Sequence, residues 1–506
     1  MKTSKIRTVL SAVLLALQVA AEGVAAAFVL RLNVLPNQYL LLMLAAFILL
    51  TALTAGLLFL HGNKPVGLVR QIVGWILAIL IAIACLLVGK VAFDAYRTLH
   101  EVTKPVEQTS VYNMYILVRA DDPAQTVADV ADYPFGIIAD YDEEHTQQAI
   151  LLTQEETGKT LRVTPYEMIS GLADAILEKQ VDAAFINGAA LVLLTEDAAY
   201  EDFLEKVRIL QTIPLVQLEE IEETTEPSTV PVESITNTPF VVYISGSDTR
   251  NKKLRISRSD VNILAVVNPV TKQVLLVNTP RDYYVANPAG KGKKDKLTHC
   301  GLYGPECSMG ALEILYGIKV DYYAQVNFTG LETLVDAIGG ITVNSPQAFR
   351  CGGYRDIQIV KGENHLNGRE ALEFARERYN VKGGDNGRGK NQMRVITAII
   401  QKLTTGTTAI SNYSSILKSM EGMFKTSVSM DDVSALVKMQ LDDMATWNVQ
   451  SFAATGTGGR EKNYSSPGHK AYVMYPNKAS VAHASALMER VLAGEILTAE
   501  DMVVPK

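Results

Sequence analysis

Three apolar stretches in the first hundred residues limit most strongly what this chain can fold into. They span roughly residues 8–30, 38–60 and 71–93, and each has about the 20 residues that a helix needs to cross the ~30 Å hydrocarbon core of a bilayer. A cleaved signal peptide is the alternative for the first stretch, but two more stretches follow closely and no small-residue cleavage site precedes polar sequence. The chain is therefore predicted to begin, over residues 1–94, with three transmembrane helices.

Basic residues near these stretches predict the direction in which they cross. Cytoplasmic loops of membrane proteins carry an excess of lysine and arginine. The connection between the first two helices offers only Arg31, whereas more basic residues precede the first helix or join the second to the third, namely Lys2, Lys5, Arg7, Lys64 and Arg70. The N-terminus is therefore predicted to be cytoplasmic, and the domains after about residue 94 extracytoplasmic, in a multi-pass protein of the cell membrane. Glu22, an acid at membrane depth, is either functional or buried against a neighbouring helix.

The rest of the 506 residues is long enough for more than one folded domain. Their charge limits the possible partners, because a net charge of −7 and a pI of about 5.7 argue against a general nucleic-acid binder. Cys85 lies in an apolar stretch, and Cys300, Cys307 and Cys351 are too few for a disulfide scaffold. Two of those three could pair outside the cytoplasm, and the sequence does not say which two.

The soluble part divides in two at an acidic linker. Residues 108–216 alternate strand-like and helix-like runs, which predicts a small α/β accessory domain. Residues 217–238 are acidic, rich in Thr and Pro and without apolar periodicity, as expected of a solvated linker. Residues 239–506 alternate strands, such as 261–268 and 273–279, with helical patterns, which favours an α/β domain with a central β-sheet flanked by helices.

Charged residues stand at the ends of several of these strands. Asp248 ends one strand and Asp260 precedes the next, so both carboxylates could meet at one sheet edge, where such hard oxygen ligands suit magnesium that also touches a substrate phosphate. Arg258 stands two residues before Asp260, and Arg281 with Asp282 follows the next strand. Open α/β sheets bind ligands just past their strand ends. The alternative is structural, since aspartate is common in turns and at strand ends.

A cluster of cations is the most informative feature of the second domain. Arg376 and Arg378 close a helix, and the glycine-rich loop after it brings four more polar residues, Asp385, Arg388, Lys390 and Gln392. Arginine forks match phosphate oxygens and glycines let the backbone approach a charged group, so a pyrophosphate is the expected ligand. Lys296, on a loop between strand and helix, is a further basic candidate. The alternative is a network of salt bridges with Glu373, Glu377 or Asp385 on a solvated face.

Other reaction classes have no motif in this chain. The sequence contains no Walker loop, no G-x-S-x-G elbow, no H-E-x-x-H helix, and no order of Ser, His and Asp that spacing singles out. Covalent catalysis by a protein nucleophile is therefore not expected.

Several motifs in this order resemble the LytR-CpsA-Psr family of cell-wall glycopolymer transferases over about residues 238–405. They are GSDTR at 246–250, RSD at 258–260, TPRD at 279–282, KLTHCGLYG from Lys296, and FARERY with DNGRGKNQ. The three helices followed by an accessory domain are similar to the capsule-associated branch of that family. The resemblance implies a domain that faces the outside of a Gram-positive envelope, in agreement with the topology predicted above.

The resemblance also implies roles for individual residues. Asp248 and Asp260 would hold Mg²⁺, and an apolar tunnel between sheet and helices would take the isoprenoid tail of a polyprenyl lipid. The residues around the pyrophosphate of that lipid would be Arg258, Arg281, Arg376, Arg378, Arg388 and Gln392. The chain departs from the family pattern at Asn391, where many relatives have an arginine directly before the glutamine.

The reaction that this resemblance implies is a phosphoryl transfer. A peptidoglycan sugar hydroxyl attacks the glycan-side phosphorus of a polyprenyl-pyrophosphate-linked polymer, and polyprenyl phosphate leaves. Such a reaction mainly needs positioning and charge neutralisation, and Asp282 is a candidate base for the hydroxyl. Two alternatives stay open: a non-catalytic regulator of envelope polysaccharide synthesis or export, which older family labels describe as transcriptional attenuation, and a prenyl pyrophosphate phosphatase. The residues do not say whether the glycan is a capsular polysaccharide or teichoic-acid-like.

Overall fold

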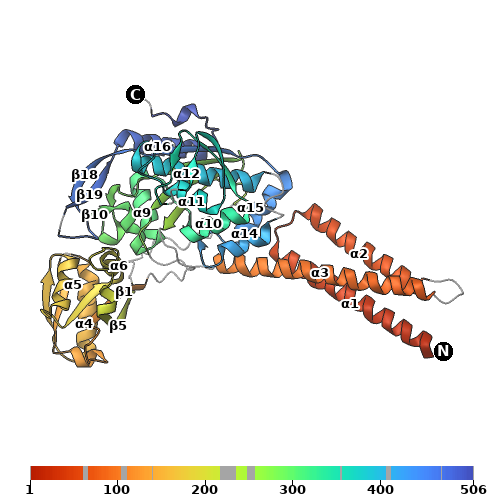
Figure 1. The fold of residues 1–506 in the computed structure, drawn as a ribbon, viewed down its shortest axis with the longest axis horizontal. Helices are drawn as coiled ribbons and strands as arrows, with labels where there is room; N and C mark the ends of the chain where they lie inside the picture. Colours follow the sequence, from red (N-terminus) through yellow and green to blue (C-terminus); the bar gives the residue numbers. More distant parts are fainter. Residues whose placement is uncertain are drawn as a thin grey trace.

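Three long helices begin the chain in the computed structural model: α1 (Lys2–Leu32), α2 (Asn37–Phe59) and α3 (Leu68–Val102). Each contains a stretch long and apolar enough to cross a membrane, which agrees with the three predicted helices, although α3 continues beyond residue 93. Figure 1 shows them side by side, extending away from the other domains. The structure describes residues 2–60, 67–103, 111–139, 141–216, 235–247, 257–353, 356–405, 412–468 and 470–504. Lys64 and residues 217–234 of the predicted linker therefore lie outside the described residues.

Glu22, the acid within α1, is buried and bonded within the helix bundle. Its carboxylate accepts hydrogen bonds from Gln18 Nε2 at 2.9 Å and from Thr51 Oγ1 of α2 at 2.6 Å. A polar group in hydrocarbon is costly unless it has such partners. The structure therefore favours the packing role of Glu22, in which its carboxylate joins α1 to α2.

The accessory domain is a five-stranded sheet in the order β3-β2-β4-β1-β5. Alternate residues of β1 point to opposite faces: Leu117 packs with α5 and α6, whereas Ile116 and Val118 pack on the side of α4. Both faces are thus covered by helices, and the domain is α/β, as the alternating sequence pattern predicted. The elements of this domain are β1 (Val111–Arg119), η1 (Val127–Val130), β2 (Pro134–Ile138), α4 (Glu143–Thr157), β3 (Arg162–Tyr166), α5 (Ile169–Leu177), β4 (Ala183–Asn187), α6 (Gly188–Thr195), α7 (Phe203–Lys206) and β5 (Val207–Val216).

The C-terminal domain is built on a six-stranded sheet in the order β16-β11-β6-β7-β8-β17. Strands β6 and β11 run parallel, β7 is antiparallel to its neighbours β6 and β8, and β17 is parallel to β8. The ends of β6, β8 and β11 and the start of β7 therefore lie at the same edge of the sheet, which we call the upper edge. The strands are β6 (Phe240–Ser247), β7 (Val261–Asn268), β8 (Gln273–Asn278), β11 (Tyr322–Asn327), β16 (Phe424–Thr426) and β17 (Asn448–Ala453).

The remaining elements of this domain are helices and short strand pairs that surround the sheet (Figure 1). They are β9 (Tyr284–Ala286), η2 (Pro288–Gly290), β10 (Lys294–Lys296), α8 (Leu297–Cys300), η3 (Gly301–Tyr303), α9 (Pro305–Tyr316), α10 (Phe328–Ala337), β12 (Ile341–Ser345), β13 (Phe349–Arg350), β14 (Gln358–Ile359), β15 (Gly362–Leu366), α11 (Gly368–Arg376), α12 (Gly384–Thr404), α14 (Tyr413–Met420), α15 (Met430–Asp443), β18 (Gly456–Lys462), β19 (Lys470–Pro476), α16 (Lys478–Leu492) and η4 (Glu500–Met502).

Helices cover both faces of the six-stranded sheet. Leu264 of β7 and Leu275 of β8 point to one face, where they share an apolar core with α9 and α16. Ile263 and Leu276 point to the other face, where they contact Met393 and its neighbours on α12. Strands buried on both faces read as continuous apolar runs, which is why these strands were recognisable in the sequence as a flanked central sheet.

The C-terminal domain also packs directly on the membrane helices. Ser434 Oγ of α15 donates a hydrogen bond to the carbonyl of Leu32 at the end of α1 (3.1 Å), and Lys438 Nζ donates to Asn37 Oδ1 at the start of α2 (3.0 Å). Val433 and Val437 of the same helix pack against an apolar cluster from α1 and α3. The domain is therefore seated on the end of the helix bundle where α1 meets α2.

The glycine-rich segment after α11, which was predicted to be a loop, instead forms the first turns of α12. Its glycines are explained by close packing. A Cβ on Gly389 would lie 2.3 Å from Asn278 Nδ2 at the end of β8, and one on Gly387 would lie 2.5 Å from the carbonyl oxygen of Lys382. Because these glycines have no side chain, α12 can begin in contact with the edge of the sheet, even though glycine disfavours helix formation.

Candidate active site

Strand connections bring Asp260 and Arg281 together at the upper edge of the sheet. Asp260 directly precedes β7, and its backbone N–H donates to the carbonyl of Gly246 in β6 (2.9 Å). Arg281 follows β8, and its Nη1 lies 2.8 Å from Asp260 Oδ1. Asp248, the other predicted metal ligand, follows β6 in the sequence but lies outside the described residues. Its meeting with Asp260 stays a prediction.

Arg281 lies between two carboxylates, and a lysine joins the same group. Its Nε is 3.7 Å from Asp282 Oδ2, and Lys296 Nζ is 3.3 Å from Asp282 Oδ1. Burial alone would lower the pKa of Arg281, but the charges of Asp260 and Asp282 outweigh it and raise that pKa above its usual value. The guanidinium therefore stays charged, and the predicted residues Asp260, Arg281, Asp282 and Lys296 form one contiguous cluster.

Thr298 supports this cluster from the turn that also carries Lys296. Its Oγ1 donates to Asp260 Oδ1 (3.3 Å), and its backbone N–H donates to the carbonyl of Arg281 (2.8 Å). The carbonyl of Thr298 in turn accepts from the N–H of Ser259 (3.0 Å). Sequence reasoning selected Lys296 but missed Thr298, and the available signal was its position two residues later in the same motif, KLTH.

The first turn of α12 contributes a second buried arginine. Arg388 Nη2 lies 2.6 Å from Asp385 Oδ1, and the Arg388 side chain is only 12% exposed. Burial lowers the pKa of Arg388; the charge of Asp385 opposes this shift, and that of Arg281 adds to it. Arg388 therefore faces the Arg281 cluster closely enough for the two guanidinium groups to repel each other.

Two guanidinium nitrogens in this cluster are buried without a hydrogen-bond partner in the described part of the chain. They are Nε of Arg281 and Nε of Arg388. Buried donors are normally satisfied, and an orphaned one points to a missing partner. An anion bound by the two arginines would relieve their mutual repulsion, as phosphate oxygens do with arginine forks. The site therefore fits a phosphate-bearing ligand.

Arg376 and Arg378 reach this region from the end of α11. Arg376 Nη1 lies 3.3 Å from Glu373 Oε1, and its guanidinium stacks 4.7 Å over the ring of Phe328, the first residue after β11. Arg378 stacks on Tyr379 at 4.7 Å and lies near enough to Arg388 to act on the pKa of that group. Both arginines are thus placed at the upper edge, Arg376 beside the predicted salt-bridge partner Glu373.

Glu377, between the two arginines, accepts hydrogen bonds from backbone N–H groups. Its Oε1 accepts from the backbone N–H groups of Arg378 (3.0 Å), Tyr379 (2.8 Å) and Asn380 (2.9 Å). Burial alone would raise the pKa of Glu377, but hydrogen bonds from the backbone lower it below the usual value. The carboxylate therefore fixes the turn that presents Arg378.

For three predicted residues, the described part of the chain shows no hydrogen bond or ion pair to the cluster. Arg258 Nε instead pairs with Glu196 Oε2 of the accessory domain at 2.6 Å. Lys390 is exposed on α12, and Gln392, two residues further along that helix, is partly buried. Asn391, the departure from the family pattern, is buried; its Nδ2 donates to the carbonyl of Phe374 (3.3 Å), and its Oδ1 accepts from Arg394 Nη1 (2.9 Å). Asn391 thus serves packing between α11 and α12.

The comparisons with known proteins agree on one family. The LytR_cpsA_psr family model matches residues 215–481. A polyisoprenyl-teichoic acid–peptidoglycan teichoic acid transferase, TagU of Enterococcus faecalis, is 39% identical over 223 residues, which cover 44% of this chain and 71% of that protein. TagU of Bacillus subtilis is 37% identical over 196 residues, 38% of this chain and 62% of that protein. The crystal structure of B. subtilis TagU is 29% identical with a TM-score of 0.40, covering 52% of this chain and all of that one.

Proposed function

This chain belongs to the LytR_cpsA_psr family, and from that membership we propose that it transfers a polyprenyl-pyrophosphate-linked glycopolymer to peptidoglycan. The observation that carries the proposal is the pair of buried arginines, Arg281 and Arg388, whose Nε groups lack hydrogen-bond partners among the described residues. They occupy the sheet edge where the pyrophosphate of such a lipid would bind. The relatives named as teichoic acid transferases support a teichoic-acid-like or other anionic glycopolymer as the donor.

The proposed reaction forms one phosphorus–oxygen bond and breaks another. A peptidoglycan sugar hydroxyl attacks the phosphorus next to the glycan, and the bond from that phosphorus to the bridging oxygen breaks, so polyprenyl phosphate leaves with both bonding electrons. The hydroxyl proton passes to a carboxylate at the cluster, for which Asp282 is placed between Arg281 and Lys296. The two arginines neutralise charge that builds up on the phosphoryl oxygens and on the leaving group.

The acidic residues at the same edge fit a magnesium ion. Asp260 offers hard carboxylate oxygen, the ligand type that Mg²⁺ prefers alongside substrate phosphates and water. We propose Asp260 and Asp248 as its protein ligands, with Asp248 lying outside the described residues. When bound, the ion supplies additional positive charge against the pyrophosphate. Within the described parts of the chain no cluster of three or more acidic, histidine or cysteine ligands forms, so substrate oxygens would complete the coordination.

An apolar face leads away from this polar edge and suits the isoprenoid tail. Between the sheet and α12, the buried residues Ile263 and Met393 are surrounded by apolar side chains that are only partly buried, including Ile244, Ile396 and Trp447. Partly covered apolar surface beside a polar site is what an amphipathic ligand needs. We propose this face as the contact for the polyprenyl chain.

We propose that the site lies on the extracytoplasmic side of the membrane. Basic residues predict that the loop between α1 and α2 faces the outside, and α15 of the C-terminal domain is hydrogen-bonded at exactly that loop, at Leu32 and Asn37. The donor lipid and the peptidoglycan acceptor would both be reached from this side of the membrane.

The test is a transfer assay with the full-length protein, a lipid-linked glycopolymer, peptidoglycan and Mg²⁺. We expect Arg388→Ala to lower kcat about a hundredfold, because removing one donor aimed at developing charge typically has that effect. Arg369→Ala is the matched control, since Arg369 is 47% exposed and pairs with the exposed Asp356. Full turnover by Arg388→Ala would contradict the proposal. Lipid binding without transfer by the unaltered protein would favour a regulator, and release of free glycan phosphate a phosphatase.

A further inference from the structure

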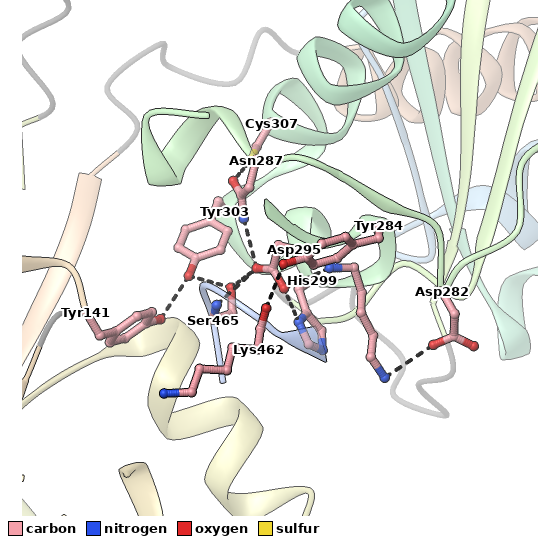
Figure 2. Close-up of polar contacts among 11 residues, drawn as sticks. Tyr141, Asp282, Tyr284, Asn287, Asp295, His299, Tyr303, Cys307, Lys462 and Ser465 are labelled. Atoms are coloured by element: carbon pink, nitrogen blue, oxygen red, sulfur yellow. Dashed lines mark hydrogen bonds and ion pairs between the residues drawn. The ribbon is translucent and has the colours of Figure 1, made fainter. Parts of the chain in front are cut away.

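A continuous chain of hydrogen bonds crosses from the accessory domain into the C-terminal domain (Figure 2). Tyr141 of the accessory domain lies with its hydroxyl 2.8 Å from the hydroxyl of Tyr303, which in turn lies 2.9 Å from Ser465 Oγ. Ser465 Oγ donates to Asp295 Oδ2. Because the single hydrogen of Ser465 goes to Asp295, Tyr303 is the donor to Ser465. The Tyr141 hydroxyl contacts Tyr303 and also donates to Asn187 Oδ1 at 3.3 Å within the accessory domain. The hydroxyls of Tyr303 and Ser465 are therefore oriented toward the Asp295 carboxylate, and Tyr141 joins this chain to the accessory domain.

Other polar groups complete the environment of Asp295. Oδ2 also accepts from Asn287 Nδ2 (3.1 Å) and from the N–H of Ser465 (3.1 Å). Oδ1 accepts from the N–H of Lys296 (2.8 Å) and lies 2.7 Å from His299 Nδ1. Burial alone would raise the pKa of Asp295, but these partners outweigh it and lower that pKa, so the carboxylate stays ionised.

The junction is buried on both sides of the domain boundary. Tyr141 is 2% exposed, and Asp295 and Ser465 are fully buried. Tyr464 packs its ring 5.3 Å from that of Tyr141 and 6.2 Å from that of Tyr303, and it contacts the apolar core of the accessory domain. A buried polar network is costly unless all its members are satisfied. The two domains therefore fit together at this point with defined geometry.

Asp295 stands at the start of the segment that builds one side of the candidate active site. Lys296, whose N–H it binds, pairs with Asp282, and Thr298 binds Asp260 and the backbone of Arg281. A displacement of Asp295 would thus shift contacts to three residues proposed to bind or activate the substrate.

We propose that the accessory domain completes the transfer site through Tyr141, whose hydroxyl holds Tyr303, Ser465 and Asp295 in the arrangement that positions Lys296 and Thr298. Tyr141 is a positioning residue: it contacts other side chains of the network and acts on the reaction through them. The proposal rests on the proposed function, since the reaction it assists is the glycopolymer transfer described above. In this proposal the accessory domain contributes to catalysis without binding a ligand of its own.

The first test is the kinetics of Tyr141→Phe in the full-length protein. The substitution removes one hydroxyl and keeps the ring, so we expect kcat to fall about fivefold, the factor that corresponds to one net hydrogen bond of about 1 kcal/mol. The KM for the lipid donor should stay unchanged. Tyr200→Phe is the matched control, because the Tyr200 hydroxyl also makes a side-chain hydrogen bond but donates to Asp174 within the accessory domain. Equal kcat values for the two variants would overturn the proposal.

A double-variant comparison asks whether Tyr141 acts through Lys296. In a Lys296→Met background the Tyr141→Phe substitution should have little further effect, since the group that it positions is already missing. Tyr303→Phe should lower kcat by a similar factor to Tyr141→Phe, and combining the two should not multiply the losses. Fully multiplicative losses in both combinations would show that Tyr141 acts by another route.

The second readout does not depend on the reaction. Amide hydrogen exchange over residues 294–299 should be faster in Tyr141→Phe than in the unaltered protein and in Tyr200→Phe, because the Lys296 N–H is held by Asp295. If the unaltered protein shows no transfer but Tyr141→Phe still speeds amide exchange over residues 294–299, the proposed function is wrong. The positioning of this segment by Tyr141 is then still supported. Unchanged exchange in an active protein would overturn the positioning alone.

Discussion

At the scale of single residues, Gly368 shows how closely α11 must approach α10 to bring Arg376 to the site. A Cβ on Gly368 would lie 2.1 Å from the carbonyl oxygen of Glu332, a backbone atom that no side-chain rotation can move away. The N–H of Gly368 also donates to Asp336 Oδ1 (2.7 Å). Glycine at this position therefore serves close packing, since its backbone needs no conformation that other residues avoid.

Gly368→Ala should accordingly destabilise the C-terminal domain by about 1–3 kcal/mol, the usual cost of forcing atoms into a filled space. Gly171→Ala in α5 of the accessory domain is the control, because its nearest neighbour would be 4.0 Å away and alanine is the better helix former. Thermal unfolding of the two variants measures the difference. A Gly368→Ala protein as stable as the control would show that α11 can move without cost.

Individual site residues were predictable from sequence where a charge stands directly at a strand end. Asp260, Arg281 and Asp282 are of this kind, and the structure brings them together. Thr298 and Asn278 were missed, because their importance arises from contacts with segments distant in the chain. Asn391 could be recognised as unusual, but only the structure shows that it is buried against Phe374 and Arg394.

At the scale of elements, α6 of the accessory domain meets the loop before β7 at a charged contact. Glu196, the residue after α6, pairs with Arg258 at 2.6 Å. The side chains of Arg258 and Glu196 are 41% and 32% exposed. If Arg258 binds the pyrophosphate as proposed, this carboxylate would compete with the phosphate for the same guanidinium. The accessory domain therefore also contacts Arg258, a residue predicted to bind the pyrophosphate, at a point separate from Tyr141.

Removing that carboxylate charge should strengthen substrate binding. We expect Glu196→Gln to lower the KM for the lipid donor by up to about fivefold, a limit set by the small free energy of exposed ion pairs. Asp202→Asn is the control, since Asp202 pairs with Lys206 at 2.7 Å elsewhere in the accessory domain. A KM that does not respond to Glu196→Gln would indicate that Arg258 makes no contact with the pyrophosphate.

Elements with a strong periodic pattern were predicted well, and those defined by distant partners were not. The central strands β6, β7, β8 and β11 are continuous apolar runs and were recognised. Strand β17 was missed, because it has an irregular pattern of burial and becomes a strand by pairing with β8. The first turns of α12 were read as a loop because glycine usually breaks helices, whereas here its small size is what the packing against Asn278 requires.

At the scale of the whole molecule, the C-terminal domain is seated on the end of the three apolar helices. Val437 of α15 packs against the cluster formed by Leu32, Leu99 and their neighbours. No pattern in the sequence predicted this contact, since it joins residues separated by most of the chain. It joins the domain to α1 and α3 in one arrangement.

Val437→Asp should loosen this seating, because an unpaired charge in an apolar contact is unfavourable. We expect kcat/KM with a membrane-embedded donor to fall several-fold, while a short-chain, water-soluble donor is used as before. Val503→Asp is the control, as Val503 is 70% exposed near the C-terminus. Equal losses with both donors would point to damage within the domain instead of altered orientation.

The pairing of β17 with β8 has a consequence for biogenesis. Residues 448–453 must return to residues 273–278 to complete the sheet, so a growing polypeptide cannot close this domain until nearly all of it has been synthesised. At a synthesis rate of roughly 5–20 residues per second, β17 is completed on the order of ten seconds or more after β8. The accessory domain, whose strands all lie within residues 111–216, can fold during that interval. It would then present Tyr141 on a finished surface to a partner that is still assembling.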